Sequence, residues 1–520
     1  KYNKQTIAAK MTDVPGHTRS IIDPMYDAGI RLLHVGINSA CPLPSVPTFC
    51  RWRSPSGNDL LLVYQKDYGE DEVLPDGKTV VSINFTGDNH GPHSYERVKK
   101  IYADLRKRYP QAQLVGASFN DVARELLLIK KDLPVVTSEI GDTWIFGYGG
   151  APIRMAKFRA VSRLYSQWLN EGKIKKDSDV ALDFAAELGL IAEHTQGVDV
   201  KTHLRQWDKY DMDKFLKGRS EGVFSMAEAS WKEIDNYIDS AIAFLPASLQ
   251  KEAREVVAEV DKVKLEDNSK MKPMERKRWE QPIAGGMTLA GLSYQMFDGD
   301  DYDDFQNRYL RARYGWALDD LGKRGLKESH AVSVTLYAQT MAQSVRKEKK
   351  GTRIITELRF PENEKVDKRV YPERIQVNCF TTKNGKRSEV ALTIYGKPAV
   401  RLPESYWLSF TVPGIESVIA EKMGERVNLM DVVEKGNRQM HGIDRYVDLI
   451  TSGETIRISS KEAFLLNVGE AQGLNYSTNY PDKRKGAHFN LNNNLWGTNF
   501  SMWNEGSLTY HFVIETLNRK

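Results

Sequence analysis

The sequence has few cysteines and no long apolar run. Its 520 residues contain three cysteines, Cys41, Cys50 and Cys379, without CxxC spacing. Cys41 and Cys50 leave room for one bridge, but nothing requires a disulfide framework. No apolar segment approaches the roughly 18 residues that a membrane span needs.

No signal peptide is visible, and the chain begins at Lys1 without an initiator methionine. Because Thr6–Ala9 is typical of a buried strand, we expect an N-terminal part of the protein, with any targeting segment, to lie upstream. A periplasmic or secreted location is favoured if that segment is a signal peptide. The oligomeric state is not indicated by the sequence.

A strong charge of one sign is also lacking. The net charge is +5, with 28% charged and 41% hydrophobic residues, which is typical of a globular protein. The basic residues of Lys347–Lys350 lie among acidic ones, so a nucleic-acid partner is not expected. No G-x-S-x-G elbow, P-loop or G-x-G-x-x-G motif occurs, which argues against a serine hydrolase of that kind and against nucleotide chemistry.

A chain of this length is expected to form several domains. Over residues 1–150, short apolar strands alternate with amphipathic helices, which predicts parallel βαβ units in a β/α barrel or a doubly wound sheet. The predicted strands are Thr6–Ala9, Leu32–Val35, Phe49–Trp52, Leu60–Tyr64, Val80–Phe85, Leu114–Ala117 and Val135–Thr137. The predicted helices are Arg19–Ala28, Tyr95–Arg108 and Phe119–Ile129.

The pattern changes twice after residue 150. Residues 151–328 show helical periodicity, with Pro152 at a first helical position, and predict a helical bundle. Residues 329–520 are β-branched, alternating and interrupted by Gly and Pro, which predicts an antiparallel β-sandwich. The clearest helices are Ala181–Ala192, Val223–Phe244 and Leu249–Val263, and the clearest strands are Arg353–Phe360, Arg374–Phe380, Glu389–Tyr395 and Ser405–Val412.

Candidate site residues follow the predicted strands, because catalytic groups in parallel β/α folds lie at the carboxyl ends of strands. Asp13 follows the first strand and precedes a tight Pro-Gly turn, although an Asp here is equally suited to cap the next helix. Asp88 and His90 lie between two glycines after Val80–Phe85, where a turn role for Asp88 is as reasonable as a site role.

Two further segments carry reactive side chains. Glu139, Asp142 and Trp144 follow the strand Val135–Thr137; either carboxylate can be an ordinary surface charge, and an indole commonly stacks on sugar rings. His194 ends a helix, where a lone His is more often structural than a ligand. Together these residues suit hydrolysis of a polar substrate with a zinc-type metal.

Four of these segments resemble, in order, the catalytic region of the glycoside hydrolase family 38 α-mannosidases. Asp13-Val14-Pro15-Gly16-His17-Thr18 followed by Ala28-Gly29-Ile30 is similar to D-P-F-G-H-S … M-G-F, and 49–57 is similar to the F-x-W-x-G-x-D-G-S hairpin. Residues 87–92 resemble G-D-G-G-G-G-P, and 193–197 stand where that family has Q-H-D-x-x-x-G. The whole chain, including Trp496-Gly497-Thr498-Asn499-Phe500, looks closer still to the uncharacterised bacterial domain of unknown function 5054.

This resemblance implies a zinc-dependent, retaining glycosidase with a barrel, a helical bundle and β-sandwich domains. It implies that Asp13 is the nucleophile and a zinc ligand, and that His194 is a second ligand. The family's other two ligands come from an N-terminal H-x-D, which this chain lacks, so they are expected upstream, for about one zinc per chain. Glu139 is the first candidate for the acid/base and Asp142 the second.

The resemblance also implies a carbohydrate substrate. Asp88 would bind its hydroxyl groups, and His90 and Trp144 are further candidates for substrate contacts, while His17 would orient the Asp13 loop rather than bind metal. The sugar and the linkage are not indicated.

Two alternatives stay open. A metal-dependent polysaccharide deacetylase would need a His-x-x-x-His pair, whereas His90/His93 and His194/His203 have other spacings. Thr195 stands where the family has Asp after the ligand His, which keeps open a carbohydrate-binding relative without catalytic activity.

Overall fold

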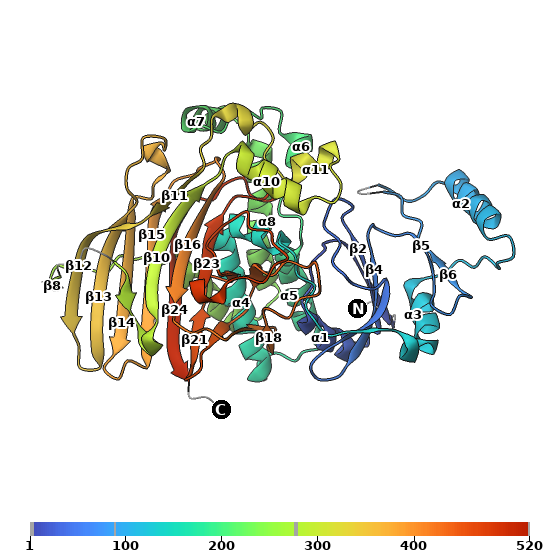
Figure 1. Cartoon of the computed structure of the whole chain (residues 1–520), viewed down its shortest axis with the longest axis horizontal. Helices are drawn as coiled ribbons and strands as arrows, with labels where there is room; N and C mark the ends of the chain where they lie inside the picture. Colours follow the sequence, from blue (N-terminus) through green and yellow to red (C-terminus); the bar gives the residue numbers. More distant parts are fainter. Residues whose placement is uncertain (1–4, 88–89, 275–278, 518–520) are drawn as a thin grey trace. The chain divides into compact units, whose positions relative to one another are not determined.

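The computed structural model describes residues 5–87, 90–274 and 279–517, which fall into two compact units (Figure 1). The small unit comprises Lys1–Trp144 and Asp431–Gly436, and the large unit comprises Ile145–Met430 and Asn437–Lys520. In the described part of the chain, no helix combines the length and apolar character needed to cross a bilayer.

The small unit is built on a five-stranded sheet of order β1-β2-β4-β3-β7. Strands β1, β2 and β4 are parallel, whereas β3 is antiparallel to β4, and β7 runs parallel to β3. The strands are β1 (Ala8–Asp13), β2 (Leu32–Ile37), β3 (Phe49–Arg53), β4 (Asp59–Gln65) and β7 (Val135–Val136), and the helices are α1 (Ile22–Asp27), α2 (Tyr95–Arg108) and α3 (Phe119–Leu128).

Every residue of β2 and β4 is buried. This burial explains why the sequences of both strands are mostly apolar. Successive side chains of a strand point to opposite faces. Leu33 and Leu62 accordingly pack with Ile22 of α1 on one face. Leu61 packs with Leu126 of α3 on the other. Helices thus cover both faces, as in α/β folds.

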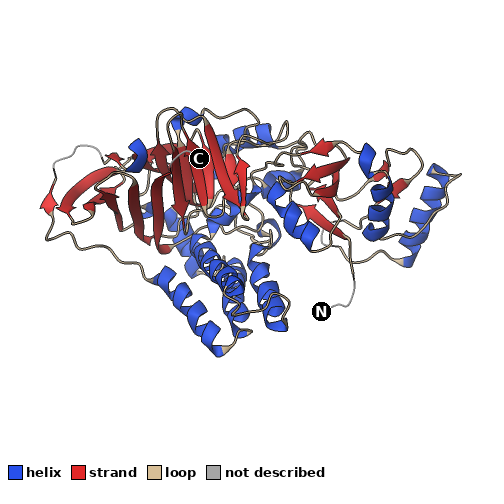
Figure 2. Cartoon of the chain, turned by 90° about the horizontal axis from the view of Figure 1, so that it is seen from below, coloured by secondary structure: helices blue, strands red, loops and turns tan. Residues whose placement is uncertain are grey.

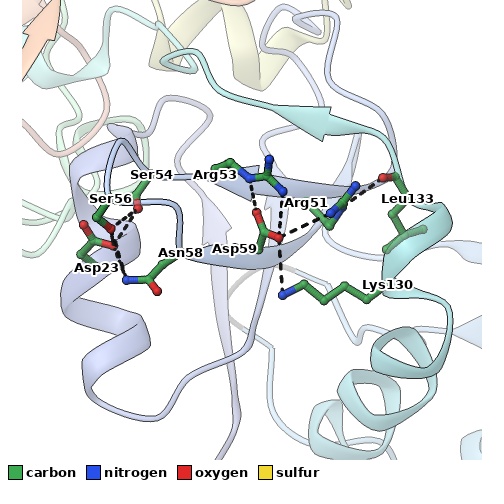
Figure 3. A network of polar contacts seen from close by, with 9 residues as sticks. All are labelled: Asp23, Arg51, Arg53, Ser54, Ser56, Asn58, Asp59, Lys130 and Leu133. Atoms are coloured by element: carbon green, nitrogen blue, oxygen red, sulfur yellow. Dashed lines mark hydrogen bonds and ion pairs between the residues drawn. The ribbon is translucent and has the colours of Figure 1, made fainter.

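The β3–β4 hairpin is held by two carboxylates (Figure 3). Asp23 of α1 accepts hydrogen bonds from Ser54, Ser56 and Asn58 at 2.7–2.8 Å, which fixes the turn. Asp59 forms ion pairs with Arg51, Arg53 and Lys130. Burial opposes ionisation of Asp59, but these cations hold its pKa below the ordinary value. The hairpin motif of the sequence therefore has a structural role.

Two predicted strands of the small unit differ in the structure. The strand expected over Val80–Phe85 is shorter, β6 (Val80–Ser82), and pairs with β5 (Asp71–Val73) in a separate two-stranded sheet. The strand expected at Leu114–Ala117 does not form. Among the described residues, β1 and β7 have no outer neighbours, so the five-stranded sheet is open there; this fits the expected partial β/α barrel or doubly wound sheet, and barrel closure is not shown.

The large unit begins with helices, and its Pro152 occupies the first turn of α4 as predicted. Helix α4 packs on α9, and α5 packs on α8. The buried indole of Trp168 in α4 donates to Glu252 of α9 at 2.8 Å. The helices are α4 (Pro152–Asn170), α5 (Asp179–Gly189), α6 (Val200–His203), α7 (Met212–Ser220), α8 (Ser225–Ala243), α9 (Ala247–Asp261), α10 (Gly299–Tyr309) and α11 (Gly315–Asp320).

Two antiparallel sheets form the rest of the large unit (Figure 2). The ten-stranded sheet contains β18 (Glu425–Asn428), β17 (Ser417–Lys422), β20 (Tyr446–Ile450), β21 (Thr455–Ser460), β24 (Gly506–Leu517), β15 (Arg387–Lys397), β14 (Arg374–Thr382), β13 (Gly351–Arg359), β12 (Gln339–Lys347) and β8 (Lys272–Pro273). The seven-stranded sheet contains β11 (Val334–Tyr337), β10 (Thr288–Met296), β16 (Glu404–Thr411), β23 (Ala487–Asn493), β22 (Leu465–Val468), β19 (Met440–Gly442) and β9 (Gln281–Pro282). Strands β8–β10 lie within the range expected to be helical, so the sheets begin before residue 329.

Aromatic residues join the two sheets. Phe410 of β16 and Phe489 of β23 contact Phe512 of β24, with ring centroids 5.4 and 5.1 Å apart. All three rings are buried. The sheets therefore pack face to face through a common core, as in a sandwich.

Phe512→Ala is expected to lower the free energy of unfolding by about 3–5 kcal/mol, because it leaves a cavity between the sheets. Urea unfolding measures the loss. Tyr337→Ala removes an aromatic ring that is 67% exposed. This control is expected to change stability by no more than about 0.5 kcal/mol. Equal losses in both variants would contradict the packing described here.

Candidate active site

Asp13, the last residue of β1, has a strained backbone. Its φ of 83° lies in the left-handed region, which non-glycine residues rarely adopt. Such a conformation costs on the order of 1–3 kcal/mol and persists only when its surroundings fix it. The Asp13 carbonyl accepts the Asn38 backbone N–H at 2.8 Å. Strain of this kind concentrates at functional sites.

Two side chains orient the Asp13 carboxylate. Tyr68 donates its hydroxyl to Oδ1 at 2.5 Å, and Asn38 donates its amide to the same oxygen at 2.9 Å. Asn38 follows β2 and Tyr68 follows β4, so the ends of three parallel strands meet at this carboxylate. Gly36 permits the approach, because a Cβ there would lie 2.8 Å from the Tyr68 Cα. Sequence reasoning missed both donors, although Asn38 directly follows the buried strand β2 and Tyr68 lies three residues after the buried strand β4.

A partly buried cation, Lys10, contacts Tyr68. Lys10 Nζ is 2.9 Å from His34 Nδ1 and donates to the Tyr68 carbonyl at 2.8 Å. Burial lowers the pKa of Lys10 to about 8. Burial, assisted by the Lys10 charge, lowers the pKa of His34 to about 4. His34 is therefore neutral at pH 7, and its Nε2 lies 2.8 Å from Gln65 Oε1.

His17 and Tyr64 brace the loop that follows Asp13. His17 Nε2 lies 3.1 Å from the Val14 carbonyl, and the His17 backbone exchanges hydrogen bonds with Ile140 at 2.8 and 3.1 Å. Burial lowers the pKa of His17 to about 4, so the ring is neutral at pH 7. Tyr64 donates its hydroxyl to the Pro15 carbonyl at 2.9 Å.

Glu139 is 4% exposed, and its carboxylate caps a helix. Its Oε1 accepts the Thr18 hydroxyl at 3.0 Å and the Arg19 backbone N–H at 2.8 Å, at the start of the 3₁₀ helix Arg19–Ile21. Its backbone pairs with the segment Asp431–Gly436, donating to the Asp431 carbonyl at 3.0 Å and accepting from Val433 at 2.9 Å. These contacts are those of a structural carboxylate.

Asp142 lies beside the Asp13 loop and is partly exposed. A Cβ added to Gly16 would lie 2.7 Å from the Asp142 Cβ. Asp142 Oδ1 accepts the backbone N–H groups of Thr143 and Trp144 at 2.6 and 3.1 Å. Strand β7 is antiparallel to β1, β2 and β4. The expectation that this segment leaves the sheet at the same strand edge as Asp13 is therefore wrong. Asp142 instead comes close to Gly16 because Ile140 pairs with His17.

The Gly87–His93 segment is described in part, since Asp88 lies outside the described residues. His90 is exposed and lines an open hollow of about 550 Å³ with Phe85, His93 and Arg97. His93 Nε2 lies 3.1 Å from the Asn84 carbonyl. Trp144, the other residue expected to contact substrate, is partly buried.

His194 belongs to the large unit, and its Nδ1 lies 2.8 Å from Glu193 Oε1. Within the described residues, no three or more His, Cys, Asp or Glu side chains gather in a group suited to a metal ion. Asp13 belongs to the small unit and His194 to the large unit, so their pairing as zinc ligands stays a prediction.

The fold is similar to that of an α-mannosidase of known structure. The alpha-mannosidase from Enterococcus faecalis V583 aligns with a TM-score of 0.55 and 9% identity, over 99% of this chain and 75% of that chain. A glycosyl hydrolase family 38 protein from Enterococcus faecalis aligns at 10% identity over 98% and 73% of the two chains, with a TM-score of 0.42 that is too low to carry an argument.

Sequence comparison adds a second resemblance. The family described as domain of unknown function (DUF5054) matches residues 149–280. No curated protein matches the chain. The resemblance to an α-mannosidase fold is thus confirmed, and that to domain of unknown function 5054 is confirmed over residues 149–280.

Lys10 is expected to titrate near pH 8 rather than at its ordinary 10.5, as measured by NMR of its side chain. Because the folded-state pKa is the lower one, wild type should gain stability relative to Lys10→Met as pH rises from 8 to 10.5. Lys131→Met, at an exposed position, is the control for loss of one positive charge. A Lys10 resonance that titrates near 10.5 would contradict its burial beside His34.

Proposed function

We propose that this protein is a retaining, α-mannosidase-like glycoside hydrolase that forms a covalent glycosyl intermediate on Asp13. The observation that carries the proposal is the strained, strand-end position of Asp13, whose carboxylate is oriented by Tyr68 and Asn38. The likeness of the whole chain to an α-mannosidase fold supports it.

Asp13 is the proposed nucleophile. Its carboxylate attacks the anomeric carbon as the bond to the leaving oxygen breaks, and a glycosyl ester forms. Tyr68 and Asn38 both bind Oδ1, so they fix the plane of the carboxylate before substrate arrives. Positioning of this kind contributes directly to the rate of such a step.

Asp142 is the better supported acid/base. It lies beside Gly16 and is partly exposed, whereas Glu139 is buried and caps the helix at Arg19. In the first step the acid protonates the leaving oxygen; in the second it takes a proton from the water that cleaves the ester. Retention requires the two carboxyl groups to lie roughly 5 Å apart. Asp88, His90 and Trp144 are proposed to contact the sugar.

Asp13→Asn is expected to lower kcat/KM on an aryl α-mannoside by about 10³-fold or more, because it removes the nucleophile's charge. Asp142→Asn should lower it by about 10²–10⁴-fold. Asp132→Asn, at an exposed position in the same unit, is the control and should keep wild-type turnover. Normal turnover in Asp13→Asn would overturn the nucleophile assignment.

Glu139→Gln separates the two acid/base candidates. If Glu139 only caps the Arg19 helix, its substitution costs about 1–3 kcal/mol of stability and leaves kcat within a few-fold of wild type.

NMR of the first-formed sugar should detect the α-anomer, because two displacements retain configuration. Wild-type protein that binds α-mannosides without turning them over would instead establish the carbohydrate-binding alternative.

Zinc binding is tested apart from these steps. Metal analysis of the full-length protein is expected to find about one zinc per chain, with Asp13 and His194 as two of its proposed ligands. His194→Ala should reduce this content, while His203→Ala, at an exposed position nearby in sequence, should not. Absence of zinc from active wild type would remove the metal from the proposal and leave the carboxylate assignments in place.

A further inference from the structure

Arg401, in the large unit, is a buried cation that lacks a carboxylate partner. It is 2% exposed and precedes β16. Its guanidinium lies over the rings of Tyr210 and Phe224, 4.2 and 5.2 Å from their centroids. Its single hydrogen bond among the described residues is a long one, 3.5 Å, to the Trp207 carbonyl. Burial of a charge without a partner costs several kcal/mol, so this arrangement calls for a counterion.

A second cation shares the same cavity. Lys323 lines it with Arg401 and donates to the Trp496 carbonyl at 2.9 Å. Burial, assisted by the like charge of Arg401, lowers the pKa of Lys323 to about 7. Among the described residues, no carboxylate lies within ion-pair distance of either cation. Burial lowers the pKa of Arg401, and the charge of Asp208, which lies beyond ion-pair distance, only partly opposes that shift. Two positive groups therefore face one cavity with no carboxylate in contact with either.

The other charged residues of the lining are already paired. Asp319 lies 3.5 Å from Arg324 in an ion pair at the edge of the cavity. Lys201 binds Asp320 at 2.8 Å and Asp199 at 3.0 Å. Arg401 and Lys323 are therefore the charged residues of the lining without an ion-pair partner among the described residues.

The motif Trp496–Phe500 closes the cavity. A Cβ at Gly497 would overlap the carbonyl oxygen of Asp320, so only glycine allows this loop to pack there. The Thr498 carbonyl accepts the Val200 backbone N–H at 2.9 Å, which ties the loop to α6. This close packing leaves a cavity of about 20 Å³. A cavity of this size holds about one water-sized occupant.

We propose that Arg401 and Lys323 bind a single small monovalent anion of halide size, such as chloride. Two cationic donors supply charge-assisted contacts, and the cavity volume excludes polyatomic ions such as sulfate unless the Trp496–Phe500 loop moves. The site lies wholly within the large unit and does not depend on the proposed hydrolase activity. The bound anion would stabilise the contact between this loop, α6 and the chain before β16.

The test is thermal unfolding of the full chain in sodium chloride, sodium bromide or sodium gluconate at constant ionic strength. Chloride and bromide should raise Tm saturably over gluconate, because an ion that binds only the folded state stabilises it. Chlorine NMR line broadening, reversed by bromide, should report binding directly. The broadening should be stronger at pH 6 than at pH 8.5, since Lys323 loses its proton near pH 7.

Lys323→Met and Arg401→Gln should abolish the difference in Tm between halide and gluconate and the line broadening. Arg324→Gln removes a positive charge from the edge of the same cavity, so it is the matched control and should keep both signals. Lys323→Met keeps the aliphatic stem and serves if Arg401→Gln fails to fold. Equal Tm of wild type in chloride and gluconate, or signals unchanged in folded Lys323→Met, would overturn the proposal.

Discussion

The left-handed backbone of Asp13 is the constraint on which the small unit's candidate site depends. This conformation turns the chain at the end of β1 and presents the carboxylate to Asn38 and Tyr68. An isolated strand end would relax to an ordinary φ. Here the Asn38 backbone holds the Asp13 carbonyl and Tyr64 holds the Pro15 carbonyl, so the strain is retained by the two neighbouring strands.

Buried polar groups extend this constraint into the interior. Lys10 links the Tyr68 carbonyl to His34, which in turn contacts Gln65. Lys10 lies in β1, His34 in β2 and Gln65 at the end of β4, which are the three parallel strands of the sheet, and Tyr68 lies in the loop after β4. These linked hydrogen bonds between buried and partly buried groups favour one arrangement of their members, and the position of Asp13 is part of that arrangement.

The sequence predicts the elements better than their connections. Helix α4 with Pro152 at its start, helix α2, and the strands β2, β3 and β4 follow from periodicity and turn residues, since those signals are local. The direction of β7 depends on the β3–β4 hairpin: β3 is antiparallel to β4, and β7 is parallel to β3. That is a tertiary property, and the expectation of a shared strand edge failed for this reason.

Site residues follow the same rule. Asp13 could be selected because it ends a strand and precedes a Pro-Gly turn. Asn38 and Tyr68 could not be selected, since their roles depend on the register that brings three strand ends together. Glu139 and Asp142 are three residues apart and equivalent in sequence, and only burial and the capping of Arg19 distinguish them. The partnerless state of Arg401 is likewise invisible in a sequence that contains abundant carboxylates.

The segment Asp431–Gly436 has a consequence for how the protein is made. Ser138, Glu139 and Ser45 of the small unit all bind this stretch, which the ribosome delivers almost 300 residues after Glu139. The small unit therefore lacks its hydrogen bonds to Asp431–Gly436 until most of the large unit has been synthesised. Any fragment cut after Trp144 would leave the Glu139 backbone without its hydrogen-bond partners Asp431 and Val433.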